Sequence, residues 1–278
     1  MNVREAFFLT IINHQLISKS NKMKRPCILI SNDDGYHAKG INKLIEFLSD
    51  IADLIVVSPE SHRSGYACAF SVEKPLRMKL RREKEGMQMW SCTGTPVDCV
   101  KVGLNEFFTD TKPDMIIGGI NHGDNASVNT HYSGTMGVTM EGCMKYIPSV
   151  AFSLCDHNSD ADFDPMRPIV REIVERVLRE GLPKGVCLNV NVPVVEKVKG
   201  VKVCRMAYGS WKKEIIKRAH PHGYEYYWLT GSYSNDEPEA SDTDNYWLTK
   251  GYATITPTTM DVTAYEMVNR MKPWEKEF

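Results

Sequence analysis

The sequence predicts an α/β fold in which a mostly parallel β-sheet is flanked by helices. Apolar runs within residues 27–30, 53–59 and 114–120 are too short for helices, and polar turn formers follow each run. Such runs are typical of parallel strands that are buried on both faces. Between the first two runs, apolar residues recur at helical spacing over residues 41–51. Strand, helix and strand therefore follow one another as a βαβ unit.

The composition is that of an ordinary globular protein. With 278 residues, 42% of them hydrophobic and 25% charged, the chain can bury a large core as one domain or as a domain with an appendage. A formal net charge of −1 gives no general attraction to nucleic acid or to an anionic membrane, so we expect neither as a partner. The eight cysteines lie singly, without a C-x-x-C motif, which favours reduced thiols and a cytoplasmic protein. No apolar stretch reaches the ~18 residues of a membrane helix.

We expect three parts along the chain. Residues 1–22 form an extension outside the fold, because Met23 stands just before the first strand and is a candidate natural start. An Asn-His interruption and the lack of a small-residue cleavage site argue against a signal peptide there. Residues 23–200 form the main α/β core. Residues 201–278 form a hairpin and an oligomerisation segment that packs on this core.

The segments after the first βαβ unit predict a hairpin and then a helix. Alternating patterns at residues 76–80 and 87–90 predict the two strands of the hairpin, with the charged run 81–85 exposed between them. Thr95 is a predicted N-cap, because a proline follows it and Asp98 falls in the first turn. A helix is therefore expected to begin here.

The second half of the core continues the alternation of strands and helices. Strands are predicted at residues 148–154 and 186–192, and the most regular amphipathic pattern, over 166–178, predicts a helix that ends at Gly181. Residues 133–135, Ser-Gly-Thr, precede another helical pattern and bring hydroxyl and backbone N–H groups together. This arrangement indicates either ordinary N-capping or an anion site.

The pattern changes after residue 200. Residues 201–206 alternate as a strand, and the aromatic residues between Trp211 and Trp228 are spaced as in a projecting hairpin. A long exposed aromatic hairpin is costly in a monomer, so we expect another subunit to cover it. A short helix capped within residues 241–244, a strand at 252–257 and a peripheral helix at 264–271 complete the predicted elements.

Two acidic residues, Asp33 and Asp34, follow the first strand directly. Ligands bind outside the carboxyl ends of the strands in open α/β sheets, so these side chains lie where chemistry is usually done. Adjacent carboxylates converge only if the chain turns, which Gly35 permits, and they repel unless a cation or a proton is shared. The pattern indicates either a metal site or an ordinary Asx turn.

Ser64 and Asn121 lie at two other predicted strand ends. Together with the acidic pair they form a set of candidate metal ligands in which every donor atom is an oxygen. Oxygen ligands suit hard divalent cations, and the lack of a His or Cys cluster argues against zinc. The sequence contains neither a Walker-type G-x-x-x-x-G-K-[ST] motif nor a G-x-G-x-x-G motif after the first strand. Four histidines of these loops are expected to form hydrogen bonds or to lie on the surface: His37, His62, His122 and His131.

These segments resemble the SurE family of survival-protein nucleotidases over about residues 24–260. The resemblance rests on motifs in the same order: ILISNDDGYHAKGI (28–41), PESHRSG (59–65), TGTPVDCV (93–100), GGINHGDN (118–125), YSGTMG (132–137) and ITP (255–257). It implies a Rossmann-like core and a domain-swapped homodimer or homotetramer. It also implies a metal-dependent phosphomonoesterase acting on nucleoside 5′- and 3′-monophosphates, and in some members on short polyphosphate.

The resemblance also implies a set of site residues and one divalent cation, Mg²⁺ or Mn²⁺, in each subunit. The implied metal ligands are Asp33, Asp34, Ser64 and Asn121, and the implied phosphate-binding residues are Asn125, Ser133, Gly134 and Thr135. We expect attack by water with Asp34 or Asp33 as the catalytic base. A covalent aspartyl-phosphate is less favoured, since the DxD spacing of aspartate-nucleophile phosphatases is absent. The GVTMEG segment after Met136 and the aromatic hairpin depart from the family pattern, which bears on substrate preference and assembly.

Two other functional classes fit parts of this pattern. A binding module that senses nucleotide or metal without turnover does not require two clustered carboxylates, both of which are present. A dinucleotide-dependent oxidoreductase requires the glycine fingerprint, which the sequence lacks. The phosphomonoesterase is therefore the preferred hypothesis, with the sensor module as the alternative.

Overall fold

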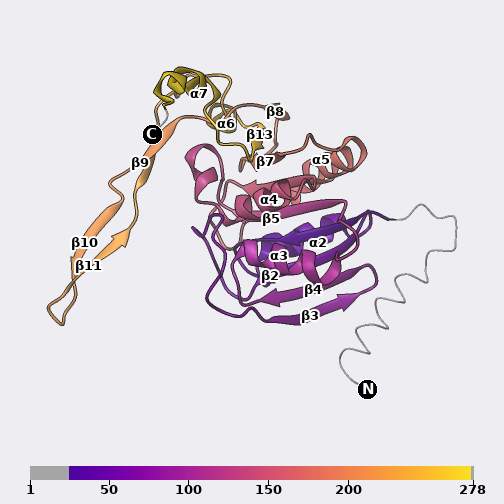
Figure 1. Ribbon diagram of the computed structural model, residues 1–278. Helices are drawn as coiled ribbons and strands as arrows, with labels where there is room; N and C mark the ends of the chain where they lie inside the picture. Colours follow the sequence, from indigo (N-terminus) through magenta and orange to yellow (C-terminus); the bar gives the residue numbers. More distant parts are fainter. Residues whose placement is uncertain (1–24, 277–278) are drawn as a thin grey trace.

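A nine-stranded sheet runs through the protein in the order β3-β4-β2-β1-β5-β6-β7-β13-β8 (Figure 1). The structure is a computed structural model that describes residues 25–276. The strands of the sheet are β1 (Cys27–Ser31), β2 (Asp53–Pro59), β3 (Met78–Lys84), β4 (Met87–Cys92), β5 (Met115–His122), β6 (Ser149–Leu154), β7 (Val186–Val192), β8 (Val201–Val203) and β13 (Ala253–Thr259). Neighbouring strands from β4 to β7 are all parallel, whereas β3 and β13 run antiparallel to β4 and β7. The predicted mostly parallel sheet is confirmed.

Helices cover both faces of this sheet. Helices α2 (Lys39–Leu48) and α5 (Arg167–Glu180) bury apolar side chains with Ile28 and Ile30 of β1. Helices α3 (Pro96–Phe107) and α4 (Gly134–Met144) bury theirs with Leu29 on the opposite face. Successive side chains of a strand point to opposite faces, so one central strand contributes to both halves of the core.

Strand β1 lies at the point where the strand order reverses. Its Ile28 is paired with Leu54 of β2 on one side and with Met115 of β5 on the other. The chain therefore leaves β1 toward one edge of the sheet and later returns to β1's other side. Crevices that bind ligands open at the carboxyl ends of strands at such a reversal. Both the acidic pair after β1 and Asn121 in β5 belong to this region.

Helix α3 begins as its sequence predicts. The Thr95 hydroxyl accepts a hydrogen bond from the Asp98 backbone N–H at 3.1 Å, and the Asp98 carboxylate accepts one from the Thr95 N–H at 2.8 Å. This reciprocal capping box satisfies N–H groups that have no partner inside the helix. The Thr95 hydroxyl also donates to the carbonyl of Ala69, so the cap fastens the loop before the hairpin to the helix.

Removing this cap is expected to destabilise the protein measurably. Thr95→Ala should lower the free energy of unfolding by about 1–2 kcal/mol, because the N-cap acceptor and the bond to Ala69 are both lost. Thr109→Ala, just beyond the other end of the same helix, is the control. The Thr109 hydroxyl is exposed and bonds only within its own turn, to Asn105, so its removal should change stability by less than about 0.5 kcal/mol. Urea unfolding of the two variants makes the comparison, and equal losses would contradict this account of the cap.

The charged run, the end of β5 and the end of β8 differ from their predicted positions. Most of the charged run 81–85 lies inside β3 rather than in the hairpin turn, because β3 is the edge strand and its charges remain exposed to water. Strand β5 continues to His122, so Asn121 lies on a strand and not in the following loop; the pairing with β6 shifts register between Gly118 and Asn121. Strand β8 ends at Val203 instead of residue 206.

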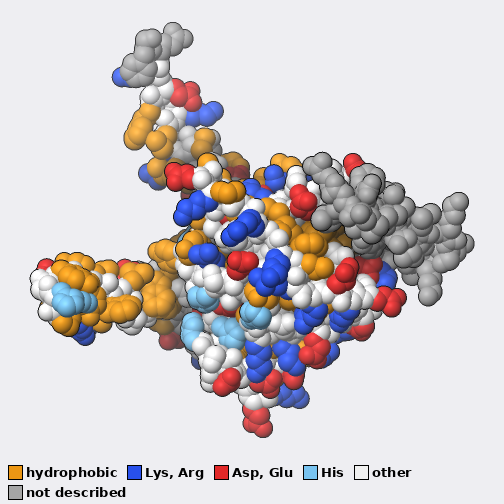
Figure 2. All heavy atoms as spheres, turned by 90° about the horizontal axis from the view of Figure 1, so that it is seen from below, with side chains coloured by type: hydrophobic (Ala, Val, Ile, Leu, Met, Phe, Trp, Pro, Cys, Tyr) orange, Lys and Arg blue, Asp and Glu red, His pale blue; other side chains and the backbone are white. Residues whose placement is uncertain are grey.

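The predicted aromatic hairpin projects from the sheet as a long arm (Figure 1). Its base pairs β9 (Gly209–Lys212) with β12 (Ser232–Asn235), and its outer part pairs β10 (Ile215–Ala219) with β11 (Glu225–Leu229). Figure 2 shows hydrophobic side chains gathered along the arm. Tyr227 and Trp228 are 59% and 62% exposed. Cover by another subunit stays a prediction.

The remaining C-terminal elements lie beside the base of the arm. Thr243 caps α6 (Asp244–Thr249) through the Tyr246 N–H, as the sequence predicts, and α7 (Tyr265–Met271) buries none of its residues. Beyond the boundary predicted at residue 200, the chain returns to the main sheet through β8 and β13.

The predicted extension, residues 1–22, and Met23 lie outside the described residues. Within residues 25–276, no helix combines the length and apolar character needed to cross a membrane.

Candidate active site

The turn after β1 is held by buried polar contacts that present Asp33 and Asp34 at the carboxyl edge of the sheet. The Asn32 amide donates to the Gly35 carbonyl at 3.0 Å and accepts from the Ser58 hydroxyl at 2.6 Å. Gly35 adopts a φ of +94°, a conformation that residues with a Cβ rarely take. The sequence interpretation missed this role of Asn32, because its partner Ser58 lies on a different strand.

Asp33 is buried between this turn and the start of α4. Its side-chain Oδ1 accepts a hydrogen bond from the Thr135 hydroxyl at 2.7 Å, and only 3% of the residue is exposed. A Cβ placed on Gly134 would lie 2.7 Å from the Asp33 Cβ, so the helix approaches the carboxylate as closely as a glycine allows. Burial, reinforced by the negative charge of Asp34, raises the pKa of Asp33 to about 6.

Asp34 lies beside the end of β5. Its Oδ2 accepts a bond of 3.4 Å from the backbone N–H of His122, and its Oδ1 lies 3.2 Å from Nδ1 of His62. His62 belongs to the loop that also carries Ser64. The carboxylate of Asp34 thus connects two of the predicted ligand-bearing segments. The expectation that His62 forms hydrogen bonds or lies on the surface holds, because its side chain is exposed, but the sequence did not identify its contact with Asp34.

The loop that carries Ser64 is anchored at Asp33. The backbone N–H of Arg63 donates to the Asp33 carbonyl at 2.7 Å, and Ser64, the next residue, is exposed. Asn121, 8% exposed, uses its amide nitrogen to donate to the carbonyls of His122 and Gly123. Its amide oxygen is therefore the atom that would face a cation. The ligand roles of Asp33, Asp34, Ser64 and Asn121 stay predictions.

The predicted phosphate-binding residues lie on the segment that leads into α4. The Ser133 hydroxyl accepts a hydrogen bond from the Met136 N–H at 3.0 Å, which is the N-capping that the sequence left as one alternative. The Asn125 side chain donates to the Ser153 hydroxyl at 2.8 Å, and its backbone N–H donates to Asn191. Thr135 directs its hydroxyl to Asp33, so its backbone N–H is the group that remains to meet an anion. A phosphate-binding role of these residues stays a prediction.

The donors at this edge fit a hard divalent cation. Among residues 25–276, no three His, Cys, Asp or Glu side chains are grouped so that they could hold a metal ion. A cation at the acidic pair would therefore need neutral oxygens to complete its coordination, and a serine hydroxyl and an asparagine amide are available on the adjacent segments. This donor set suits Mg²⁺ or Mn²⁺ and not zinc. The two adjacent carboxylates also place negative charge at this edge that a cation would neutralise, and burial raises the pKa of Asp33.

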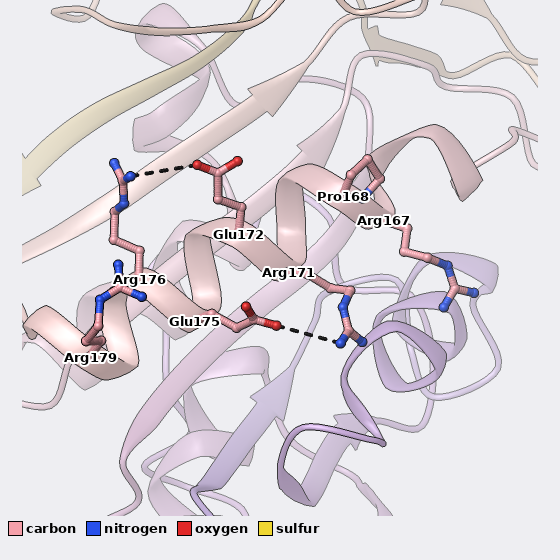
Figure 3. Close-up of a pocket in the computed structure, with 7 residues that line it drawn as sticks. All are labelled: Arg167, Pro168, Arg171, Glu172, Glu175, Arg176 and Arg179. Carbon is pink, nitrogen blue, oxygen red and sulfur yellow. Dashed lines mark ion pairs between the residues drawn. The ribbon is translucent and has the colours of Figure 1, made fainter.

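A surface hollow lies along the outer side of α5 (Figure 3) and carries paired charges. Arg171 lies 3.6 Å from Glu175, and Arg176 lies 3.8 Å from Glu172. Because α5 covers the face of the sheet opposite α4, this hollow is separate from the acidic pair. Exposed ion pairs one helical turn apart are ordinary surface features.

Comparison with known proteins identifies the family. The family model described as survival protein SurE matches residues 28–213. The chain belongs to the SurE family. It is 51% identical over 256 residues to the 5′-nucleotidase SurE of Phocaeicola vulgatus, covering 92% of this chain and 99% of that protein. It is 47% identical over 252 residues to the 5′-nucleotidase SurE of Bacteroides fragilis, covering 91% and 98%.

A solved SurE structure has the same fold. The crystal structure of the SurE protein from Aquifex aeolicus superposes on the chain with a TM-score of 0.77 at 34% sequence identity. The match covers 90% of this chain and 100% of that one. It confirms the resemblance noted in the sequence and the SurE-like core that the resemblance implies. The domain-swapped assembly stays a prediction.

Proposed function

We propose that the protein is a divalent-cation-dependent phosphomonoesterase that hydrolyses nucleoside 5′-monophosphates to nucleoside and phosphate. The observation that carries the proposal is the contact between the Asp33 carboxylate and the first turn of α4, at the reversal point of a SurE-type sheet. The name 5′-nucleotidase, printed for relatives up to 51% identical, supports the same activity. Nucleoside 3′-monophosphates and short polyphosphate are further proposed substrates, because the site would recognise a phosphoryl group.

One Mg²⁺ or Mn²⁺ per subunit would be held by Asp33, Asp34, Ser64 and Asn121. When bound, the ion supplies positive charge that offsets the two carboxylates and the charge that develops on the phosphoryl group. The protein's own contribution is to fix the ligands. Asp33 is held by Thr135, Asp34 by the His122 backbone, and Asn121 by bonds from its amide nitrogen.

The phosphate would be bound by the segment from Asn125 to Thr135. The first N–H groups of a helix have no partner inside it and favour an anion, so the N–H groups of Gly134 and Thr135 are the proposed donors. Ser133 accepts a bond from Met136 and keeps its hydroxyl proton to donate. The Asn125 amide has a second N–H besides the one that bonds to Ser153.

Asp34 is the proposed general base. It is less buried than Asp33, which is enclosed by Gly134 and Thr135 and better suited to stay a fixed ligand. Asp34 would take a proton from water as the water oxygen bonds to phosphorus and the phosphorus–oxygen bond to the nucleoside breaks. The nucleoside oxygen would leave with a proton from solvent. Asp33 as base and an aspartyl-phosphate intermediate are the less favoured routes.

We also propose that the protein functions in the cytoplasm as a homodimer or homotetramer. The exposed aromatic side chains of the arm support this assembly, because an uncovered apolar ribbon of this length favours association. The arm of one subunit would then lie against another subunit.

A panel of phosphate-release assays tests the proposed activity. AMP, GMP, IMP, 3′-AMP and tripolyphosphate are each incubated with EDTA, Mg²⁺ or Mn²⁺. We expect release from the 5′-monophosphates with a divalent ion and a loss of at least about 100-fold in EDTA, reversed when the ion is restored. A sensor module would bind AMP without releasing phosphate. Release at an equal rate in EDTA would contradict the cation dependence.

A further inference from the structure

The segment between the proposed metal ligand Asn121 and the proposed phosphate site is fastened by the base of the arm. This segment contains Asn125, then the short 3-10 helix η1 (Ser127–His131), and then Ser133 at the cap of α4. The hydrogen bonds that join it to the arm connect residues 82 and 106 positions apart in sequence. The contacts between them are therefore created by the fold and have no local sequence signal.

Ser127 receives contacts from three places in the C-terminal region. Its backbone N–H donates to buried Asp244 at 2.8 Å, and its hydroxyl donates to the Ala207 carbonyl at 2.8 Å. The Ser127 oxygen also lies 2.5 Å from the Tyr233 hydroxyl. Because the serine proton is directed to Ala207, the tyrosine is the donor in this last bond. Gly209 makes room for it, since a Cβ there would lie 2.3 Å from the Tyr233 hydroxyl.

The backbone of Ser127 needs this support. Its φ is +52°, a left-handed conformation that costs a residue with a Cβ of order 1 kcal/mol or more. Such a conformation persists only where surrounding contacts determine it. At Ser127 these contacts come from Asp244, Ala207 and Tyr233, which all lie beyond residue 200.

A second bond joins the arm to the middle of η1. Trp211 Nε1 donates to Asn129 Oδ1 at 3.0 Å, and the Asn129 amide nitrogen donates to Asp124 at 3.2 Å. Trp211 and Tyr233 are directly opposite each other in the β9–β12 pair. Side chains in opposite positions share one face of a ribbon, and the two rings lie 6.3 Å apart. One cross-strand pair therefore presents two hydrogen-bond donors to η1.

We infer that Trp211 and Tyr233 are positioning residues for the phosphate site and that they act through Asn129 and Ser127. Together these four residues form what we call the arm-base clamp. The clamp fixes η1, and η1 sets the separation of Asn125 and Ser133, which flank it. The arm is thereby coupled to substrate binding as well as to assembly. This inference rests on the proposed function, since it assigns the clamp to the site of that reaction.

Conservative variants of the full-length protein test the clamp. Tyr233→Phe removes one donor and keeps the ring, and Trp211→Phe removes the other donor by replacing the indole with a smaller aromatic ring. Tyr227→Phe and Trp228→Phe make the same changes on the exposed outer strand β11 and serve as matched controls. Each clamp variant should raise KM for AMP and the inhibition constant of inorganic phosphate about fivefold, as expected for one neutral hydrogen bond, and the double variant about 25-fold. The Mn²⁺ activation constant should stay within about twofold, because Asp33 and Asp34 are held by other contacts.

Hydrogen–deuterium exchange provides a readout that does not depend on activity. Amides of residues 123–133 should exchange faster than in the wild-type protein in both clamp variants. In both controls they should exchange at the wild-type rate. If the wild-type protein releases no phosphate, the proposed function fails and exchange alone decides whether the clamp holds η1. Unchanged exchange over residues 123–133, or phosphate inhibition equal to that of the controls, would overturn the inference. A uniform loss of activity and metal affinity together would also overturn it, because that is the result of general destabilisation.

Discussion

Asp33→Asn is expected to abolish metal-dependent phosphate release and, at the same time, to stabilise the metal-free protein. Activity should fall at least about 1,000-fold, because the substitution removes one of two carboxylates that would hold the cation. At pH 8 in EDTA, the free energy of unfolding should rise by up to about 3 kcal/mol. A residue that lowers stability while supporting activity is typical of a functional site.

The sign of the stability change follows from the raised pKa. Burial, followed by the charge of Asp34, raises the pKa of Asp33 from its ordinary 3.8 to about 6 in the folded protein. Folding therefore disfavours the ionised carboxylate. The resulting stability is fully present below about pH 4 and is lost as pH rises through about 6. Asparagine stays neutral and keeps an oxygen to accept the Thr135 bond, so its advantage is absent near pH 4, grows as pH rises, and is complete above about pH 6.

Urea unfolding in EDTA at pH 4 and pH 8 measures this difference. Asp110→Asn is the matched control, because Asp110 is exposed and lies outside the site. It should leave both stability and phosphate release close to the wild-type values. If Asp33→Asn is less stable than wild type at pH 8 in EDTA, the description of Asp33 as a buried carboxylate whose ionisation is disfavoured by folding is contradicted.

Gly134→Ala is expected to reduce kcat at least about 100-fold while the protein stays folded. The added methyl group would lie 2.7 Å from the Asp33 Cβ and 3.0 Å from its Oδ2, closer than nonbonded carbon atoms approach. Either Asp33 or the first turn of α4 must move, and a shift of about 1 Å in a reacting geometry costs about 100-fold in rate. The strain should lower the free energy of unfolding by about 1–3 kcal/mol.

Gly103→Ala provides the comparison for this substitution. Its added methyl group would meet side-chain methyl groups of Leu29 and Val57 at 3.0 and 3.2 Å, in the core beneath α3. It should lower stability without changing kcat. Steady-state kinetics and urea unfolding of both variants separate the two effects. Equal kcat values for Gly134→Ala and wild type would show that the contact between α4 and Asp33 has no role in the reaction.

The local patterns of the sequence were sufficient to predict the strands and helices of the core and the position of the acidic pair. Buried strands, the capping box at Thr95 and the turn at Gly35 depend on residues close in sequence, so composition and spacing predict them. The charged run in β3 was misplaced because alternating charge at a sheet edge resembles a solvated turn. The predicted end of β5 was wrong because polar Asn121 and His122 continue a strand at the rim.

The contacts that organise the candidate site are long-range, and spacing does not reveal them. Thr135 was predicted as a phosphate ligand, yet its hydroxyl bonds to Asp33, 102 positions earlier. The hydrogen bond from Trp211 to Asn129 joins residues 82 positions apart and depends on the register of β9 against β12. Topology brings these residues together, so the sequence indicated the chemical groups but not which of them restrain the others.

Binding of Mn²⁺, followed by electron paramagnetic resonance, tests most directly whether oxygens from β1, the loop after β2, and β5 share one cation. The account predicts one ion bound per chain in the wild-type protein and in Asp110→Asn. In Asp33→Asn the affinity should be weaker by at least about 100-fold. Wild-type protein that binds no Mn²⁺, or Asp33→Asn that binds it as tightly as wild type, would contradict the account.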